Sequence, residues 1–263
     1  MRYVLVTGAY GGVGSAVVSA LEGAGFFVFA LDKYVKEPSE RVMPIEADLT
    51  QQDDILRAFD TVRSITEELY AVIHLAGVYM LDSLVEIDES RFTKIFDINV
   101  FGAYRVNKAF APLLKGGGRI LITTSELAPL DPLPFTGIYA ITKGTLDKYA
   151  YSLRMELQLL DISVSVLRPG AIKTDMLGVS MSALDDFCER SELYSCNASR
   201  FKKIVNKVEA RYVTPQKIAS KVLRIINAKR PRQVYKINRN PLLLMLNILP
   251  RTWQTKIIKA ILK

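Results

Sequence analysis

A short apolar segment that runs directly into a glycine-rich turn opens the chain. The segment YVLV at residues 3–6 is followed by TGAYGGVG at residues 7–14 and then by the helix-forming SAVV at residues 15–18. A strand, a glycine-rich turn and a helix in this order place backbone N–H groups and a helix N-terminus beside a diphosphate. We expect Gly8 to permit the tight turn, Gly12 to permit close approach of the ligand, and Gly14 to permit contact between helix and strand.

Short β-prone segments alternate with amphipathic stretches along the rest of the chain. The seven expected strands cover residues 2–7, 26–31, 42–46, 70–75, 118–124, 162–167 and 233–237. Most intervening stretches are long enough for a crossover helix, which is typical of a parallel sheet covered on both faces. With 263 residues, 49% of them hydrophobic, the chain can bury one large core. The pattern therefore predicts an α/β fold, with residues 1–263 forming a single Rossmann-type domain with a doubly wound parallel sheet of about seven strands and helices on both faces.

A carboxylate stands at the end of the second expected strand. Asp32 directly follows the apolar residues 28–31. There it could accept hydrogen bonds from both hydroxyls of an adenosine ribose, and it would repel a 2′-phosphate. The glycine-rich turn also contains no Arg or Lys. Both observations favour NAD over NADP as the cofactor, while the neighbouring Lys33 leaves NADP as the alternative.

Tyr139 and Lys143 stand four residues apart, a spacing that places two side chains on the same face of a helix. A nearby ammonium favours the phenolate and lowers the pKa of a tyrosine from its ordinary value near ~10. The hydroxyl of Ser125, from a separate segment, could then orient a substrate carbonyl. Taken alone, the tyrosine–lysine pair also fits a solvated helix face.

Together, these residues resemble the motifs of the short-chain dehydrogenase/reductase family, in the family's order and over nearly the whole chain. The matching segments are TGAYGGVG at 7–14, Asp48 in ADL, HLAG at 74–77, Asn99 in DINVFG, Ser125 in ITTS, Tyr139 with Lys143, and PGAIKT at 169–174. Two features depart from the family pattern. Leu75 replaces an asparagine, and the interval between Ser125 and Tyr139 is one residue longer than is common, which places an insertion in the proline-rich segment 129–134.

The resemblance implies an oxidoreductase that transfers a hydride between a nicotinamide cofactor and an alcohol or ketone. It assigns catalytic roles to Asn99, Ser125, Tyr139 and Lys143. Ser125 would bond the substrate oxygen and Tyr139 would move its proton. Lys143 would hold the nicotinamide ribose and lower the pKa of Tyr139, and Asn99 would hold a water that links Lys143 to solvent. The implied cofactor contacts are Gly8, Tyr10, Gly12, Val13, Gly14, Asp32, Asp48, Leu49, Ala76, Gly77, Asn99, Tyr139, Lys143, Pro169, Gly170, Ile172 and Thr174.

Several of these residues have a second interpretation. Asp48 could contact the adenine or cap the following helix, and Tyr10 could cover the adenosine or face solvent. His74 is expected to be a packing residue at a strand end. Because the chain has one histidine and two cysteines, no metal site is predicted. The alternative function is a catalytically silent NAD-binding sensor or scaffold with the same fold.

The segment 176–212 is expected to form a substrate lid, because in the family the residues after the 169–174 motif do so. It contains the apolar residues Met176, Leu177, Val179, Met181, Leu184, Phe187 and Tyr194. These residues either line an apolar pocket or pack the lid against the body. Similarity to retinol and hydroxysteroid dehydrogenases favours a hydrophobic alcohol or ketone of the steroid, retinoid or long-chain type as substrate.

The last quarter of the chain is strongly basic. Residues 201–263 contain 16 Lys and Arg and a single acid, Glu209. Within it, the tail 241–263 combines apolar residues at helical spacing with lysines, so it either packs on the body or a second subunit or lies at a membrane surface. No nucleic-acid partner is predicted. A homo-oligomer, a dimer or tetramer, is expected through residues 91–115 and 141–160, as in the family. With no signal peptide recognised, a cytoplasmic location is expected, with membrane association through the tail as the alternative.

Overall fold

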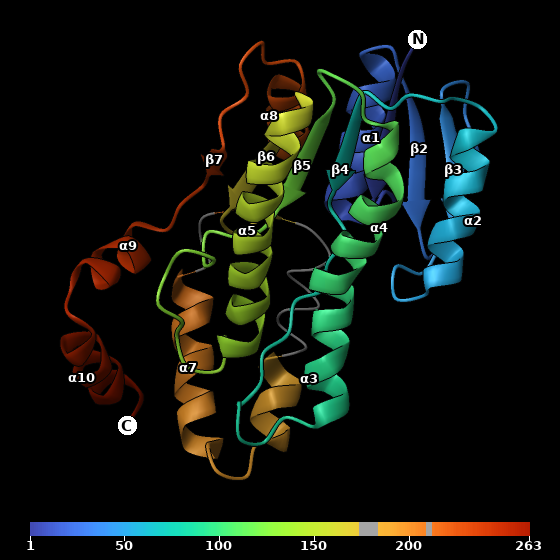
Figure 1. Ribbon diagram of the computed structural model, residues 1–263. Helices are drawn as coiled ribbons and strands as arrows, with labels where there is room; N and C mark the ends of the chain where they lie inside the picture. Colours follow the sequence, from blue (N-terminus) through green and yellow to red (C-terminus); the bar gives the residue numbers. More distant parts are fainter. Residues whose placement is uncertain (174–183, 209–211) are drawn as a thin grey trace.

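A seven-stranded parallel sheet forms the centre of the protein (Figure 1). The structure, a computed structural model, describes residues 1–173, 184–208 and 212–263. The strands are β1 (Arg2–Thr7), β2 (Phe26–Asp32), β3 (Val42–Glu46), β4 (Ala71–His74), β5 (Arg119–Thr123), β6 (Ser163–Pro169) and β7 (Val234–Ile237). Their order is β3-β2-β1-β4-β5-β6-β7, and each neighbouring pair is parallel. The sequence order reverses between β1 and β4, where such folds bind ligands. The predicted fold class is confirmed, and the strand bounds differ from expectation by at most two residues.

Helices cover both faces of the sheet. One face carries α1 (Gly12–Gly23) and α8 (Pro215–Ile226), whose apolar sides pack on alternate residues of the central strands, such as Val4 and Val6. The other face carries α2 (Gln52–Arg63), α4 (Gly102–Phe110) and α5 (Gly137–Leu157), which pack on the intervening residues, such as Leu5. This alternation follows from the two-residue period of a strand buried on both sides.

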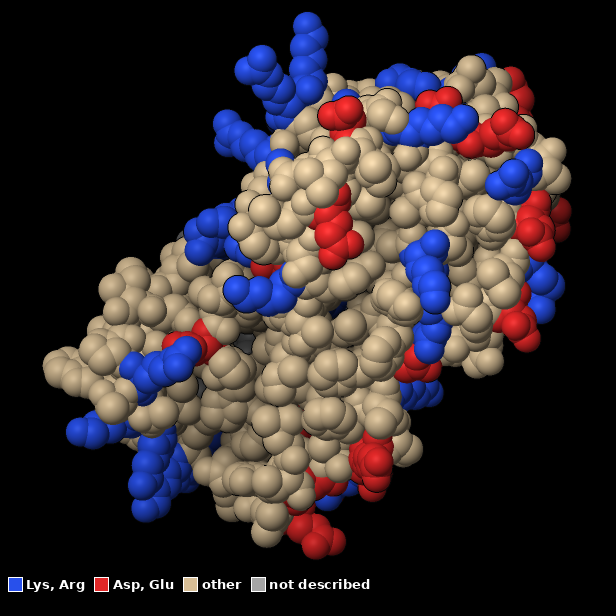
Figure 2. All heavy atoms as spheres, viewed as in Figure 1, with Lys and Arg blue, Asp and Glu red and all other residues tan. Residues whose placement is uncertain are grey.

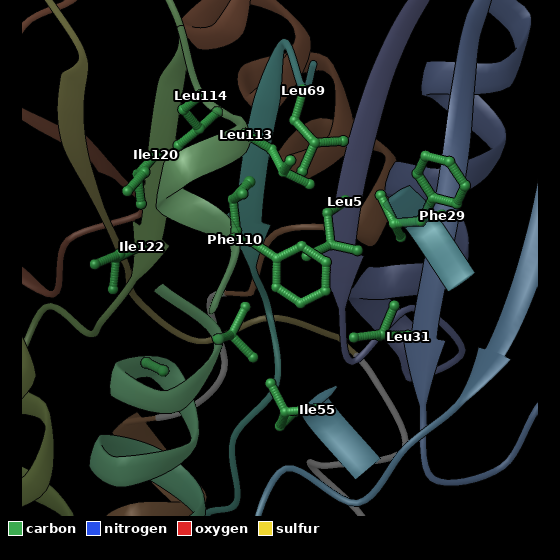
Figure 3. Close-up of a cluster of buried hydrophobic side chains, with 14 of the residues drawn as sticks. Leu5, Phe29, Leu31, Ile55, Leu69, Phe110, Leu113, Leu114, Ile120 and Ile122 are labelled. Carbon is green, nitrogen blue, oxygen red and sulfur yellow. The ribbon is translucent and has the colours of Figure 1, made fainter. Parts of the chain in front are cut away.

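Large side chains fill the space between the sheet and its second helical layer. Figure 3 shows Phe110 of α4 beside Leu5 of β1 and Leu31 of β2, with Ile55 of α2 at the edge of the same cluster. Phe110 is fully buried, so its replacement by alanine would cost about 3–5 kcal/mol of stability. This packing fixes the strand ends, from which the loops of the candidate site emerge.

Short helical elements complete the fold. The helix α3 (Glu89–Phe96) continues through a single π-helical segment (Asp97–Phe101) into α4. Two 3-10 turns, Ala111–Leu113 and Gln158–Leu160, follow α4 and α5. The part of the chain after β6 contributes α7 (Ser195–Val208), α9 (Pro241–Ile248) and α10 (Arg251–Leu262). Within the described ranges, no helix is long and apolar enough to cross a membrane.

The basic tail packs one side against the body, and its other sides remain exposed. Leu262 and Ile258 of α10 join a small apolar cluster with Phe187 and Phe201. Arg251 forms an ion pair with Asp131 at 2.8 Å. Figure 1 places α9 and α10 beside α7 at one side of the molecule, and Figure 2 shows this region as largely uncharged, with Lys and Arg along its rim. Packing on the body, the first of the two interpretations, therefore holds for the inner side of the tail.

Candidate active site

The glycine-rich turn connects β1 to α1 at the carboxyl edge of the sheet. Gly8 has a φ of +67°, and a Cβ there would lie 2.6 Å from the backbone N of Ala76 at the end of β4. A Cβ on Gly14 would lie 1.9 Å from the carbonyl oxygen of Gly8. Both positions therefore require glycine, one for its backbone conformation and one for the close contact between helix and strand. The expected roles of Gly8 and Gly14 agree with this geometry.

The N-terminus of α1 is built to receive an anion. Its N-cap residue, Gly11, has an extended backbone and, as a glycine, no side chain that could cap the helix. Residues 10–14 line a cleft of about 2120 Å³ that extends along the carboxyl edge of the sheet. Because the first N–H groups of a helix lack partners within the helix, this turn offers donors and a favourable dipole to a phosphate in the cleft. These residues fit a dinucleotide diphosphate.

Asp32, at the end of β2, stabilises the glycine-rich turn by hydrogen bonds. Its Oδ2 accepts a hydrogen bond from the backbone N of Tyr10 at 2.8 Å, and its Oδ1 accepts one from the backbone N of Lys33 at 2.7 Å. A carboxylate has about four acceptor positions, so Asp32 can stabilise the turn and still accept from a ribose hydroxyl. Tyr10 also lines the cleft, and the ammonium of Lys36 lies 5.8 Å from the centre of its ring.

Asp48 stabilises the turn between β3 and α2. Its Oδ1 accepts from the backbone N and the hydroxyl of Thr50, and its Oδ2 forms an ion pair with Lys33 at 3.0 Å. Burial opposes ionisation, but these bonds outweigh it and lower the pKa of Asp48. The N-cap of α2 is Gln51, not Asp48. Helix capping by Asp48 is therefore wrong, because the aspartate binds the turn before the helix, and it lines the cleft as expected for a cofactor contact.

The three residues predicted to take part in proton transfer all line this cleft. Ser125 follows β5, and Tyr139 and Lys143 lie on the first two turns of α5. The Oγ of Ser125 accepts from the backbone N of Leu127 at 3.1 Å, which fixes the hydroxyl, and its side chain forms a hydrogen bond with Tyr139. The ring of Tyr79 packs edge-on against that of Tyr139, with 4.7 Å between their centres.

The side chain of Lys143 lies close to Tyr139. Its Nζ lies 5.7 Å from the centre of the Tyr139 ring and donates to the carbonyl oxygen of Thr123 at 3.4 Å. A Cβ on Gly77 would lie 3.1 Å from this Nζ and 3.2 Å from Oδ1 of Asn99. Glycine at position 77 thus lets lysine and asparagine come together. Lys143 is only 5% exposed, and burial lowers its pKa to about 8.

Asn99 lies behind the cleft rather than along it. It sits in the π-helical segment that joins α3 to α4, a distortion often found at functional sites. Its amide accepts from the backbone N of Val78, and it donates to the carbonyl of Val78 and to the hydroxyl of Thr142. These bonds give Asn99 a structural role between the segment after β4 and α5, and its Oδ1 also faces the Lys143 side of Gly77.

The pKa of Tyr139 shifts in the opposite direction from the one expected. Burial of the phenol raises this pKa to about 12, and the hydrogen bond from Ser125 offsets only part of the rise. Removing the phenolate from water costs more than the neighbouring groups return at these distances. Tyr139 is therefore held as a neutral proton donor in this arrangement.

His74 is a packing residue, as expected. Its side chain is buried at the end of β4, and its Nε2 lies 2.8 Å from Oδ1 of Asn107. Burial lowers the pKa of His74 to about 4, so it stays neutral at physiological pH. It does not line the cleft.

Most of the other expected cofactor contacts also line the cleft. Leu49, Ala76, Pro169, Gly170 and Ile172 all do so. Thr174 lies outside the described residues, as do Met176, Leu177, Val179 and Met181 of the expected lid. Among the described lid residues, Leu184 and Phe187 are buried in the cluster under α10, which supports packing of the lid on the body for these two.

Sequence reasoning missed many residues that line the cleft, and three of them lie close to strand ends. Tyr79 and Glu126 follow strand ends outside the recognised motif positions, and Arg239 follows β7. Oε2 of Glu126 accepts from the backbone N of Asn240 at 2.6 Å. Burial raises the pKa of Glu126 despite this bond. A carboxylate directly after Ser125 was the only available signal, and it does not reveal a partner more than a hundred residues away.

The C-terminal helices form the second half of the cleft. Leu133 and Pro134 line it together with Tyr139. The tail adds Leu242, Leu243, Met245, Leu246, Leu249, Ile257, Ile258, Ile261 and Leu262. The cleft therefore has a polar half at the glycine-rich turn and an apolar half under the tail.

A parallel sheet with a phosphate-binding turn at its switch point and a Ser–Tyr–Lys group at the same edge defines a Rossmann-type nucleotide-binding protein. A sequence model of the family described as short chain dehydrogenase matches residues 2–184. The chain belongs to this family, whose members are oxidoreductases that bind nicotinamide cofactors.

Individual relatives extend over different parts of the chain. Estradiol 17-beta-dehydrogenase 2 of Mus musculus is 35% identical over 67% of this chain, which spans only 50% of that protein. The 3-ketodihydrosphingosine reductase of Bacteroides thetaiotaomicron is 23% identical over 96% of this chain and 93% of its own length. A short chain dehydrogenase family protein of Francisella tularensis superposes with a TM-score of 0.75, at 25% identity over 90% of this chain and 97% of its own.

Proposed function

We propose that the protein interconverts an apolar secondary alcohol and the corresponding ketone with NAD as the hydride carrier. The observation that carries the proposal is the convergence of Ser125, Tyr139 and Lys143 on the cleft that begins at the glycine-rich turn. The nicotinamide ring supplies the hydride acceptor for oxidation or the hydride donor for reduction when it is bound. All other chemistry falls to side chains of this chain.

The side chains divide the proton transfer between them. Ser125 donates a hydrogen bond to the substrate oxygen, and Tyr139 exchanges a proton with that oxygen as the hydride leaves or reaches the carbon. Because burial raises the pKa of Tyr139 to about 12, the neutral phenol is ready to donate in the reduction of a ketone. Lys143 lies close enough to favour the phenolate that remains, and it would also hold the ribose next to the nicotinamide.

The preference for NAD rests on the charges around Asp32. Its carboxylate lies at the end of β2 and lines the cleft, where it would repel a 2′-phosphate. Lys33, the residue that could attract such a phosphate, is paired with Asp48 at 3.0 Å. That pairing directs the Lys33 ammonium towards Asp48, which supports the preference for NAD.

The apolar half of the cleft supports a hydrophobic substrate. Leu133, Leu243, Leu246 and Ile258 line it, together with the partly buried Tyr139. The two relatives are named for estradiol and for a ketodihydrosphingosine, both largely apolar molecules. A steroid, a retinoid or a long-chain ketone fits this lining better than a charged sugar does. A silent sensor would need none of the four residues Asn99, Ser125, Tyr139 and Lys143 to be retained together, so we do not favour it.

Self-association would use the outer faces of α4 and α5. Tyr104 on α4 is 44% exposed, and Tyr151 and Met155 on α5 are 48% and 49% exposed. Large apolar side chains at half exposure are the kind that subunit contacts cover. We propose that these helices form a homodimer or homotetramer contact.

A substrate panel tests the proposed function. Steroids, retinoids and long-chain alcohols and ketones are incubated with the protein and either NAD or NADP, and the absorbance of the reduced cofactor is followed. Turnover with an apolar substrate and a lower KM for NAD than for NADP is expected. Turnover restricted to charged or sugar substrates, or none on any substrate despite tight NAD binding, would refute the proposal, and the second result would point to the sensor.

A further inference from the structure

The helix α9 is apolar on all sides yet has no buried residue. Seven of its eight residues are apolar, and the eighth is Asn247. Leu242, Met245 and Ile248 are 59%, 65% and 80% exposed. A helix that is hydrophobic around its whole circumference normally lies in a protein core or in lipid. Its outer side therefore lacks the environment that its sequence suits.

The neighbouring helix α10 divides its surface into three sides. Gln254, Ile258 and Leu262 face the body, where Gln254 and Leu262 are buried. Trp253, Ile257 and Ile261 repeat every four residues and stay 61%, 37% and 54% exposed. The remaining side carries the exposed Lys256, Lys259 and Lys263. An exposed apolar stripe with a Trp, flanked by lysines whose long stems can reach outwards, is the pattern of an interfacial helix.

The charges around this surface distinguish between two occupants. From residue 210 to the end of the chain there is no Asp or Glu, whereas Arg251 and the three lysines of the tail all carry positive charge. The aspartate that reaches the tail from the body, Asp131, is already paired with Arg251. A second copy docked symmetrically on this face would bring like charges together. An anionic phospholipid surface would complement them.

Some of the exposed apolar residues also line the cleft. Leu242 and Met245 of α9 and Ile257 and Ile261 of α10 are each more than one-third exposed and belong to the cleft wall. The cleft therefore reaches the exposed apolar surface at these residues of the two helices. Apolar surface around an opening to an apolar cavity suits a ligand that partitions into lipid.

We propose that the outer sides of α9 and α10 dock on a bilayer that contains anionic phospholipid, and that apolar substrate enters the cleft from the bilayer between these helices. Trp253 and Ile248 insert at the level of the headgroups while Lys256 and Lys259 contact phosphates. Docking does not depend on turnover. The entry route rests on the proposed function, because it needs an apolar substrate.

The single Trp of the chain makes docking directly measurable. Trp253 is exposed, so its fluorescence should shift to shorter wavelength when phosphatidylcholine vesicles that contain phosphatidylserine are added, and less with phosphatidylcholine alone. High salt should weaken the binding. Ile248→Glu keeps Trp253 as the fluorescent reporter. It should weaken binding to vesicles by about tenfold or more, because it places a charge where the apolar side chain would enter the bilayer. Leu159→Glu, at a residue that is 81% exposed on the 3-10 turn after α5, is the matched control and should bind like the wild type.

Several outcomes would overturn docking. The first is that anionic vesicles neither shift the Trp253 fluorescence nor cosediment with the protein. The second is that Ile248→Glu and Leu159→Glu lose vesicle binding to the same extent. A third is a concentration-dependent dimer that Ile248→Glu disrupts while vesicles have no effect, which would assign the surface to a second copy. Neither residue lines the cleft, so both variants should turn over a short water-soluble ketone at the wild-type rate.

The entry route has its own readout. Delivery of a long-chain ketone in anionic vesicles should raise kcat/KM for the wild type and for Leu159→Glu but not for Ile248→Glu. If vesicles bind and this difference is missing, the entry route is wrong while docking stands. If vesicles bind and no substrate turns over at all, the proposed function fails and docking again stands.

Discussion

The buried ammonium of Lys143 should destabilise the fold, and its removal should therefore raise stability while ending turnover. Burial lowers the pKa of Lys143 from 10.5 to about 8. This fall corresponds to roughly 3 kcal/mol of preference for the unfolded state while the lysine is charged. Removing the lysine also removes its long 3.4 Å hydrogen bond to the Thr123 carbonyl. The loss of this bond should cost about 1 kcal/mol of stability and so offset part of the gain.

Lys143→Met replaces the amine with an apolar chain of similar length. At pH 7 we expect the variant to be more stable than the wild type by about 2 kcal/mol, which raises Tm by roughly 4–8 °C for a chain of this size. The sign with pH also follows. The folded state binds the Lys143 proton less tightly than the unfolded state does, so wild-type stability from this group rises between pH ~8 and ~10.5. The advantage of the variant should shrink over the same range.

Thermal unfolding followed by circular dichroism, without added nucleotide, measures the effect at pH 7 and pH 10. Lys148→Met, at an exposed lysine on the same helix, is the control and should change Tm by no more than a surface substitution normally does. A Tm of Lys143→Met below that of the wild type at pH 7 would refute the reasoning, because it would mean that the ammonium contributes more through its contacts than burial costs. A difference in Tm between Lys143→Met and the wild type that is larger at pH 10 than at pH 7 would also refute it.

Three further perturbations test the rest of the site. Tyr139→Phe should reduce turnover by about 10²–10⁴-fold while NAD binding persists, measured by steady-state kinetics and calorimetry, and comparable turnover would remove the tyrosine from its role. Asp32→Ala should raise the KM for NAD by about tenfold and bring it closer to the KM for NADP. An unchanged ratio of the two KM values would show that the carboxylate does not select the cofactor. Gly14→Ala should impair both folding and NAD binding, because the new Cβ would lie 1.9 Å from the Gly8 carbonyl oxygen, and a normal Tm with normal NAD affinity would contradict the packing described.

The sequence predicted the sheet and the polar half of the cleft because both follow local rules. Strand periodicity and the crossover rule determine which edge of the sheet receives Gly8, Asp32 and Ser125. Tyr139 and Lys143 share a helix face at a spacing of four residues. These residues lie within a few positions of a strand end or on one helix, so short segments were enough to place them.

The direction of the Tyr139 pKa and the function of the tail could not be predicted in the same way. The pKa depends on how deeply α5 and Tyr79 bury the phenol, which only the packed structure reveals. Residues 251–262 form a helix as their spacing indicated, but that spacing is equally suited to a protein surface and to lipid. Asp48 likewise precedes a helix, and only the position of Gln51 as N-cap shows that the aspartate caps nothing.

Glu126 connects the two halves of the cleft through hydrogen bonds to segments far apart in the sequence. Its backbone N donates to the carbonyl of Pro169 at 2.8 Å, next to Gly170. Its side chain accepts from the backbone N of Asn240, the residue that caps α9. Since Glu126 adjoins Ser125, this bond ties the first turn of α9 to the segment that carries the Ser125 hydroxyl. One carboxylate therefore links the start of the apolar tail to the segment that carries Ser125, and so joins the apolar half of the cleft to its polar half.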